Sequence, residues 1–297
     1  MDKQINIPSN IIIKSIYNNL TYSLLFPRYI NEIKIKIINY LKTIEERDLK
    51  DLEIEAKLGY FFFEGNLIDS YKYINAVFVL PNFNYQNAYK YRFNAGINPN
   101  KFFLIWNSLD NESKKKNSEI SGPEIRIYNE IHYQSGKRKS LIFDKDKKQI
   151  KEEVIKKDRK NPNNTINVSN LGNDFRITIL REKETDINYN EDKEEIKRDK
   201  YRISYQFRYF RIDMSITYEK SNNIVREPSY EIELEINKLN EILRDKYGNI
   251  DYDNFALILD RFIQNIHNLY SAADKNIIMN KNININNKFG NYFENNL

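Results

Sequence analysis

The stretch SYEIELEINK (residues 229–238) alternates apolar and acidic side chains from Tyr230 to Ile236. Successive side chains of an extended strand point to opposite faces, so Glu231, Glu233 and Glu235 share one face of the predicted strand. Neighbours on that face are about 7 Å apart, and the three carboxylates therefore repel one another. The apolar residues between them form the opposite face. The pattern predicts a strand whose charged face needs cations nearby.

Three other segments have charged or hydroxyl side chains on one face and apolar side chains on the other. Across all four segments the charges are grouped by sign. Carboxylates dominate the first (52–58) and the last (229–238), and cations dominate the two segments between them. The residues are Glu53, Glu55 and Lys57 in LEIEAKL (52–58), Arg198, Lys200 and Arg202 in RDKYRISYQF (198–207), and Arg211, Asp213 and Ser215 in FRIDMSITY (210–218). One interpretation is an ordinary half-exposed sheet with its charged face in water. The grouping by sign favours strands that close around a hydrophilic tunnel.

The remaining chain contains further predicted strands and three predicted helices. Apolar spacing and capping signals predict helices at 29–44, 98–111 and 254–273. Strand-like segments lie at 89–96, 124–133, 138–143, 150–157 and 174–181. We expect an irregular arm at 1–28, one folded domain at 29–275, a mobile loop or short helix at 185–199 and an Asn-rich flexible tail at 276–297. The fold class is mainly β (α+β), with an antiparallel sheet that is closed or nearly closed.

Composition limits the classes of function. The chain has 297 residues, and 47 Lys and Arg against 42 Asp and Glu give a net charge of +5, which agrees with a polyanionic partner without demonstrating one. The absence of cysteine excludes disulfides and thiolate metal sites and favours an intracellular setting. Two histidines, His132 and His267, argue against a His-rich zinc site or a Ser-His-Asp triad. There is no run of about 18 apolar residues, so no membrane span is expected.

The two kinds of charged strand suit one chemistry. Carboxylates that cannot all remain ionised together are neutralised by a hard divalent cation that takes oxygen ligands. Arginine and lysine on opposing strands would then hold phosphate oxygens. Phosphoryl transfer needs positioning, a metal ion and cations where negative charge accumulates. The sequence therefore points to a metal-dependent enzyme that acts on phosphates.

The ordered segments DLEIEAKLG (51–59), RDKYRISY (198–205), FRIDMS (210–215) and SYEIELEI (229–236) resemble the metal-dependent RNA 5′-triphosphatases of the fungal, protozoan and large-DNA-virus type. These enzymes initiate mRNA capping and belong to the triphosphate tunnel metalloenzymes. The resemblance covers residues 30–275 and implies a closed eight-stranded antiparallel β-barrel tunnel with a charged interior, flanked by helices. The implied reaction removes the γ-phosphate of 5′-triphosphate RNA, and hydrolysis of free NTPs is also implied.

The resemblance further implies a role for each charged position. Three carboxylates correspond to ligands of Mg²⁺ or Mn²⁺, namely Glu53, Glu55 and Glu235. Glu231 and Glu233 correspond to residues that hold metal-bound water or orient the attacking water. Asp213 would orient arginines by ion pairing, and Lys57 would lie on the tunnel floor. The cations that would bind phosphate are Arg176, Arg198, Lys200, Arg202 and Arg211, with Lys156, Lys157 and Lys183 as further substrate-binding candidates. Ser215 stands where threonine is common in the family.

Two alternatives remain open. A hydrolase of tripolyphosphate, thiamine triphosphate or ATP from the same superfamily would share the tunnel and the Glu-x-Glu-x-Lys segment. A non-catalytic basic RNA-binding or scaffold protein would turn its charged face to solvent and need no metal.

The preferred function implies partners and a compartment. The partners are 5′-triphosphate RNA and an mRNA guanylyltransferase, in a separate chain or fused in a longer polypeptide, because the Lys-x-Asp-Gly signature of that enzyme does not occur here. Fungal relatives imply a homodimer. The expected compartment is the nucleus for a cellular enzyme and the cytoplasm for a viral or plasmid-encoded one.

Overall fold

The computed structural model describes residues 26–63, 66–67, 77–80, 91–158, 164–170, 173–188, 192–221 and 224–279. Its first and last described elements are the helices α1 (Phe26–Leu41) and α4 (Tyr252–Met279). Most of the expected N-terminal arm (1–28) and of the expected tail (276–297) therefore lies outside the described residues. No described helix has the length and apolarity that a membrane crossing requires.

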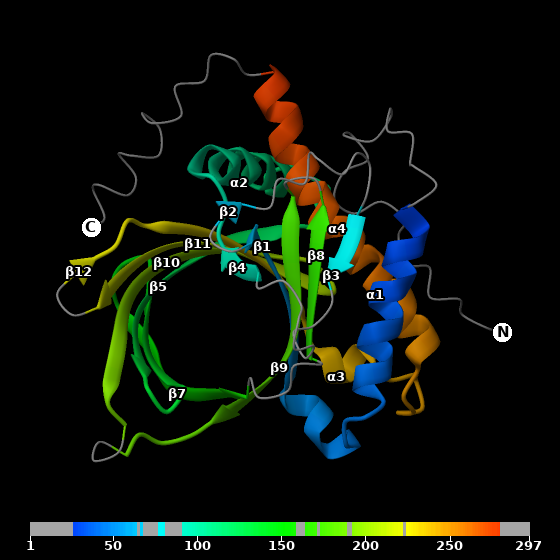
Figure 1. The fold of residues 1–297 in the computed structure, drawn as a ribbon, viewed down its shortest axis with the longest axis horizontal. Coiled ribbons are helices and arrows are strands. Elements are labelled where there is room, and N and C mark those ends of the chain that lie inside the picture. Colours follow the sequence, from blue (N-terminus) through cyan, green and yellow to red (C-terminus); the bar gives the residue numbers. More distant parts are fainter. Residues whose placement is uncertain are drawn as a thin grey trace.

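Eight antiparallel strands close into a barrel, which Figure 1 shows as a ring. Around the ring they are β1 (Leu52–Phe63), β13 (Ser229–Ile236), β11 (Phe210–Ser221), β10 (Glu194–Gln206), β5 (Ser121–Tyr133), β6 (Lys137–Asp144), β7 (Gln149–Asp158) and β9 (Asp174–Glu184). β9 pairs with β1 and so closes the ring. The predicted eight-stranded tunnel fold is confirmed.

Shorter strands extend the sheet beyond the ring. β2 (Asn66–Leu67) and β4 (Tyr91–Ala95) pair with the end of β1, and β12 (Ile224–Val225) pairs with β11. β3 (Val77–Leu80) pairs with β8 (Thr165–Asn170), which pairs with the first half of β9. The second half of β9 pairs with β7 instead. The ring therefore continues from β9 to β7 only through this second half of β9.

The alternating segments fold as strands because each has an apolar face that packs into the core and a charged face that lines the barrel. On β1 and β13 the apolar face points outward, and Ile54, Ala56, Ile232 and Leu234 are at most 1% exposed. The charged face of the same strands points into the barrel, where Glu55 is the direct partner of Glu235. A register shift of one residue would exchange the two faces, so the apolar pattern fixes the register.

Helices cover the apolar outer face on one side of the barrel, as Figure 1 shows for α1, α2 (Pro99–Ser113) and α4. In α4 the stripe of Phe255, Phe262 and Ile266 is fully buried. α2 begins as the sequence predicts, because the Asn98 side chain accepts a hydrogen bond from the Asn100 N–H at 2.8 Å. The short helices η1 (Glu46–Asp51) and α3 (Leu239–Ile242) complete the helical elements of the described chain.

The predicted loop or short helix at 185–199 requires a correction. Residues 194–199 already belong to β10, where Arg198 and Asp199 pair with β5. The described part of the preceding connection is held to the barrel because Asp192 accepts hydrogen bonds from Lys137 Nζ at 2.8 Å and from the Asn188 N–H at 2.9 Å. The polar composition reflects the exposed outer face of β10 at this end, not a break in the strand.

Candidate active site

The barrel encloses a cavity of about 400 Å³, and every strand of the ring contributes to its largely charged lining. Directly paired residues of antiparallel strands point to the same face, so the alternation along each strand decides which side chains enter the lumen. The predicted site residues that line the cavity are Glu53, Glu55, Lys57, Lys157, Arg198, Lys200, Arg202, Arg211, Glu231 and Glu233. Glu235 and Asp213 lie on the same inward faces, paired with Arg211 and Glu233 respectively.

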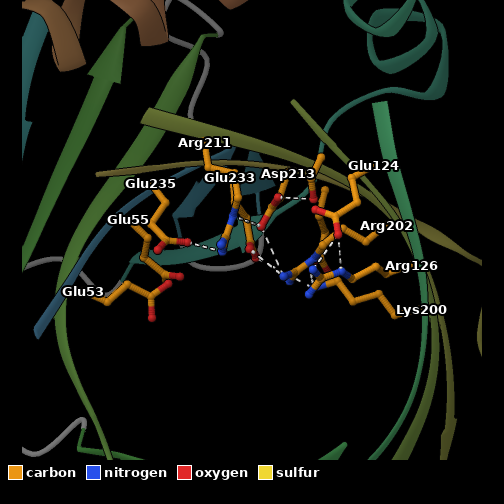
Figure 2. Close-up of polar contacts among 12 residues, drawn as sticks. Glu53, Glu55, Glu124, Arg126, Lys200, Arg202, Arg211, Asp213, Glu233 and Glu235 are labelled. Carbon is orange, nitrogen blue, oxygen red and sulfur yellow. Dashed lines mark hydrogen bonds and ion pairs between the residues drawn. The ribbon is translucent and has the colours of Figure 1, made fainter. Parts of the chain in front are cut away.

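One side of the lumen is acidic. Figure 2 shows the carboxylates of Glu53, Glu55 and Glu235 close to one another, from the neighbouring strands β1 and β13. Burial, with repulsion from the other two carboxylates, holds the pKa of Glu53 well above its ordinary value. Burial also raises the pKa of Glu235 to about 7, although Arg211 opposes this shift. The cluster is therefore costly to ionise completely.

Lys157 partly neutralises the acidic side. Its Nζ lies 2.6 Å from Glu182 Oε1, 3.6 Å from Glu53 Oε2 and 3.9 Å from Glu55 Oε2. Burial alone would lower the pKa of Lys157, but Glu55 and Glu53 outweigh burial and raise it. One ammonium group faces three carboxylates, so this side keeps a net negative charge.

The chemistry of the acidic side fits a hard divalent cation. Carboxylate oxygens are the ligands that Mg²⁺ and Mn²⁺ prefer, and Glu53, Glu55 and Glu235 supply them from two adjacent strands. In the described part of the chain, no group of three or more His, Cys, Asp or Glu side chains is already gathered around one point as metal ligands. Binding would therefore require the three carboxylates to converge. Binding would also require Glu53 and Glu235 to release their protons, because their pKa values are raised, and the bound cation would then relieve the repulsion among the carboxylates.

The opposite side of the lumen is basic. Figure 2 shows Lys200 and Arg202 of β10 beside Arg126 of β5, across the lumen from the acidic side. Lys200 is only 7% exposed, and burial together with the neighbouring Arg202 lowers its pKa despite attraction by Glu233. The guanidinium of Arg202 lies 4.9 Å from the ring centre of Tyr128. This side therefore offers positive charge to an anion in the cavity.

The cations of β10 and β11 that line the cavity, Arg198, Lys200, Arg202 and Arg211, are called the basic row. Asp213 connects this row to the acidic side. It forms ion pairs with both Arg202 and Arg211, and its Oδ1 accepts a hydrogen bond from Ser204 Oγ at 2.6 Å. Arg211 also binds Glu235, so the contacts form one chain across the lumen, as Figure 2 shows. Asp213 is only 2% exposed. Its contacts make it a group that orients arginines.

Glu233 lies between two lysines. Its Oε1 is 2.6 Å from Lys57 Nζ and 4.0 Å from Lys200 Nζ. Burial alone would raise the pKa of Glu233, but Lys57 and Lys200 hold it well below its ordinary value. Glu231, two residues away, lies 3.9 Å from Lys200 Nζ and accepts a hydrogen bond from Ser229. Glu233 is therefore a stable carboxylate at neutral pH.

Two lysines predicted to bind substrate lie on the outside of the barrel. Lys156 and Lys183 are direct partners on β7 and β9, and both are exposed. Because side chains alternate along a strand, Lys157 faces the lumen and Lys156 faces solvent. Of these two neighbours, the structure therefore places Lys157 in the cavity and Lys156 outside it.

Arg176 also lies apart from the cavity lining. It is the partner of Lys57 on β1, but its Nε donates to Asn167 Oδ1 at 2.8 Å and its guanidinium lies 4.6 Å from the Phe93 ring centre. This part of β9 pairs with β8 and not with β7. The side chain consequently packs against the outer strands.

Several lumen residues had no predicted role. Glu130 accepts a hydrogen bond from His132 Nε2 at 3.2 Å and lies 4.0 Å from Arg138 Nη1. Burial would raise the pKa of Glu130, but His132 and nearby cations lower it. On β9, Glu182 binds Lys157. The alternation of polar side chains in RIYNEIH (126–132) was the available signal for the β5 wall.

Comparisons with known proteins agree with this geometry. A family model described as mRNA capping enzyme, beta chain, matches residues 26–275. The structure of S. pombe Pct1 RNA triphosphatase is similar, with a TM-score of 0.64, 18% identity, and coverage of 86% of this chain and 98% of that chain. Pct1 in complex with the Spt5 CTD gives a TM-score of 0.61 at 17% identity, over 86% and 96% of the two chains. The Mimivirus capping enzyme triphosphatase gives 0.42 at 14% identity, over 83% and 100%. No curated protein matches the sequence.

Proposed function

The chain belongs to the family of the mRNA capping enzyme beta chain and is an RNA 5′-triphosphatase, and we propose that it removes the γ-phosphate of 5′-triphosphate RNA with Mg²⁺ or Mn²⁺ bound in the tunnel. One observation carries the proposal: the acidic cluster of Glu53, Glu55 and Glu235 shares one lumen with a row of buried and half-buried cations. A scaffold protein would gain nothing from burying these charges, because each one loses hydration.

Glu53, Glu55 and Glu235 would hold the metal ion. When bound, the ion would supply Lewis-acid polarisation of a phosphoryl oxygen and would neutralise charge on the triphosphate. The strands fix the positions of the three carboxylates, because Glu55 and Glu235 are direct partners and Glu53 is two residues from Glu55 on the same face.

The basic row would bind the phosphates. Lys200, Arg202 and Arg211 line the cavity and present N–H donors to it. Charge-assisted hydrogen bonds to phosphate oxygens are short and strong, and they strengthen as negative charge moves onto the leaving diphosphate. Arg202 and Arg211 need no reorganisation for this, since Asp213 already fixes their guanidinium groups.

Glu233 and Glu231 would orient the attacking water. The lowered pKa of Glu233 makes it a weak proton acceptor at neutral pH but a good hydrogen-bond acceptor. We therefore assign it to alignment of the water, with Lys57 fixing its side chain from the tunnel floor. Because the lumen groups address phosphates and the metal, we also propose that free NTPs are hydrolysed.

Capping supplies the proposed partners. The diphosphate-ended RNA product would be consumed by an mRNA guanylyltransferase, in another chain or fused to this one. We also propose that the protein forms a homodimer. It would act in the nucleus if it is a cellular enzyme and in the cytoplasm if it is viral or plasmid-encoded.

The proposal is tested by phosphate release from γ-labelled 5′-triphosphate RNA with Mg²⁺, with Mn²⁺ and with EDTA. We expect release only with a divalent ion, and loss of about 100-fold or more in Glu55→Gln and Glu235→Gln. Glu152→Gln is the matched control, because Glu152 lies on β7, has a 49% exposed side chain and binds Lys139. Release that persists in EDTA would exclude the metal assignment. Faster release from inorganic tripolyphosphate than from RNA would favour a small-molecule substrate.

A further inference from the structure

Glu219 holds the last arginine of the basic row. It lies on β11 and is the direct cross-strand partner of Arg198 on β10. Arg198 Nε and Nη2 both donate to Glu219 Oε2, at 3.0 and 2.8 Å. The other oxygen, Oε1, lies 2.8 Å from Arg226 Nη1. The Glu219 side chain is 15% exposed and the Arg198 side chain 34%, so the carboxylate is largely shielded from water and the guanidinium is partly accessible.

The pair repeats an arrangement that already exists on the same strand. Asp213 and Glu219 both point inward from β11, and Asp213 fixes Arg202 and Arg211 as Glu219 fixes Arg198. A guanidinium has donors on two edges. Glu219 occupies the Nε and Nη2 edge, and within the described residues Nη1 of Arg198 makes no hydrogen bond. Arg198 lines the cavity, so the other edge is available to a ligand there.

The position of Arg198 along β10 identifies the part of the substrate it can reach. Arg198 is four residues from Arg202, which corresponds to about 13 Å along an extended strand. Arg211, the partner of Glu235, pairs with Gln206 at the opposite end of β10. Arg198 therefore lies toward the end of the lumen remote from the proposed metal carboxylates, where the leaving diphosphate and its RNA would extend.

We propose that Glu219 is a positioning residue that aims Arg198 at the diphosphate leaving group of the RNA substrate. This inference rests on the proposed function of the same tunnel. Without the carboxylate, Arg198 would keep its charge but lose its fixed orientation, and it would become free to pair with other acidic groups of the lumen.

The test compares four single variants and one double variant of the full chain. Glu219→Ala removes the contact, whereas Glu219→Gln keeps an oxygen that can still accept from Arg198. Asp199→Ala is the matched control, because Asp199 pairs with Lys220 across the same two strands at 2.8 Å but on their outer face. Arg198→Ala, alone and with Glu219→Ala, shows whether Glu219 acts through Arg198. Circular dichroism and thermal melting report the fold of each variant.

We expect Glu219→Ala to lower kcat/KM for 5′-triphosphate RNA about tenfold, as for loss of one charge-assisted contact, with part of the loss in kcat because negative charge moves onto the leaving diphosphate. Glu219→Gln should recover most of the loss, Asp199→Ala should stay within about twofold of the wild type, and Glu219→Ala should have no further effect once Arg198 is alanine. An effect equal to that of Asp199→Ala, or an undiminished effect in the Arg198→Ala background, would overturn the inference. Wild-type protein that releases no phosphate from RNA would instead overturn the proposed function itself.

Discussion

The carboxylate of Asp213 holds two arginines at once: its Oδ2 lies 3.1 Å from Arg202 Nη1 and 3.1 Å from Arg211 Nε. A single buried group thereby sets the separation of two cations that line the cavity. Their guanidinium groups would otherwise be drawn further toward Glu233 and Glu235, with which they also pair. Asp213 therefore fixes the orientation in which Arg202 and Arg211 present their guanidinium groups to the cavity.

Asp213→Asn should therefore lower kcat for RNA by about 100-fold, since a buried charge pair loses one partner and the arginines lose their alignment. Ser204→Ala, which removes only the hydrogen bond to Asp213, should cost about two- to fivefold. Steady-state phosphate release from RNA measures both effects, with thermal melting to confirm folding. Equal activity of Asp213→Asn and the wild type would show that the arginines do not need this anchor.

Metal binding should depend on pH because Glu235 has a pKa of about 7 in the metal-free protein. A ligating carboxylate must lose its proton, so below pH 7 the metal competes with that proton. Because the pKa of Glu53, a second proposed ligand, is raised as well, apparent affinity for Mn²⁺ should rise by about tenfold or more per pH unit below pH 7. Titration calorimetry in two buffers of different ionisation enthalpy would count the protons released. Binding that is independent of pH and releases none would contradict the role of Glu235.

Gly59 permits the close approach of β4 to β1. A Cβ atom at this position would lie 2.1 Å from Asn94 O and 2.6 Å from Phe93 Cζ. Since the first of these is a backbone atom in a paired strand, Gly59→Ala should lower the free energy of unfolding by about 3 kcal/mol or more. Gly136→Ala, where no atom lies within 4 Å but φ is +79°, should cost about 1 kcal/mol through backbone strain alone. Urea denaturation distinguishes the two, and equal costs would refute the steric argument.

His267 should make the helical layer sensitive to acid. It is buried on α4, where it contacts Tyr29 of α1, and burial lowers its pKa from the ordinary 6.5 to about 4. Between pH 6.5 and 4 the unfolded chain therefore binds more protons at this position than the folded chain does. The free energy of unfolding should fall as the pH falls through this window, by about 3 kcal/mol from this group.

Other groups titrate in the same range, and the raised pKa of Glu235 acts in the opposite direction. The measurement is consequently the difference between wild type and His267→Gln, whose unfolding free energies are compared from pH 7 to pH 4. The wild type should lose more stability on acidification than the variant. Parallel curves would mean that His267 has an ordinary pKa in the folded protein.

The fold could be predicted where one face of a strand is apolar and the other charged. β1, β10, β11 and β13 satisfy this condition because helices or neighbouring side chains cover their outer faces, as the burial of Ile54, Ile203, Ile212 and Leu234 shows. The alternation predicted which residues of these strands share the charged face, and the grouping of charges by sign favoured turning that face into a lumen. The closing contact between β1 and β9 is non-local and joins segments more than 100 residues apart, so periodicity could not supply it.

The sequence was less informative where both faces of a strand are polar. On β7 the outer face is exposed, as Ile150 at 49% exposure indicates, and it carries lysine and glutamate as the lumen face does. Residue type therefore could not distinguish Lys156 from Lys157. Arg176 could not be placed from the sequence for another reason: this part of β9 pairs with β1 on one edge and with β8, not β7, on the other, and the Arg176 side chain contacts Asn167 and Phe93.

The two neighbouring lysines offer a direct test of the barrel register. Lys157→Ala removes an ammonium that lies within 4 Å of Glu53, Glu55 and Glu182, so the acidic cluster becomes more repulsive and its carboxylates retain protons more strongly. We expect kcat/KM for RNA to fall by about tenfold or more. Lys156→Ala and Lys183→Ala remove exposed charges from the outer face and should stay within about twofold of wild type. Equal losses from Lys156→Ala and Lys157→Ala would contradict the placement of Lys157 inside the lumen and Lys156 outside it.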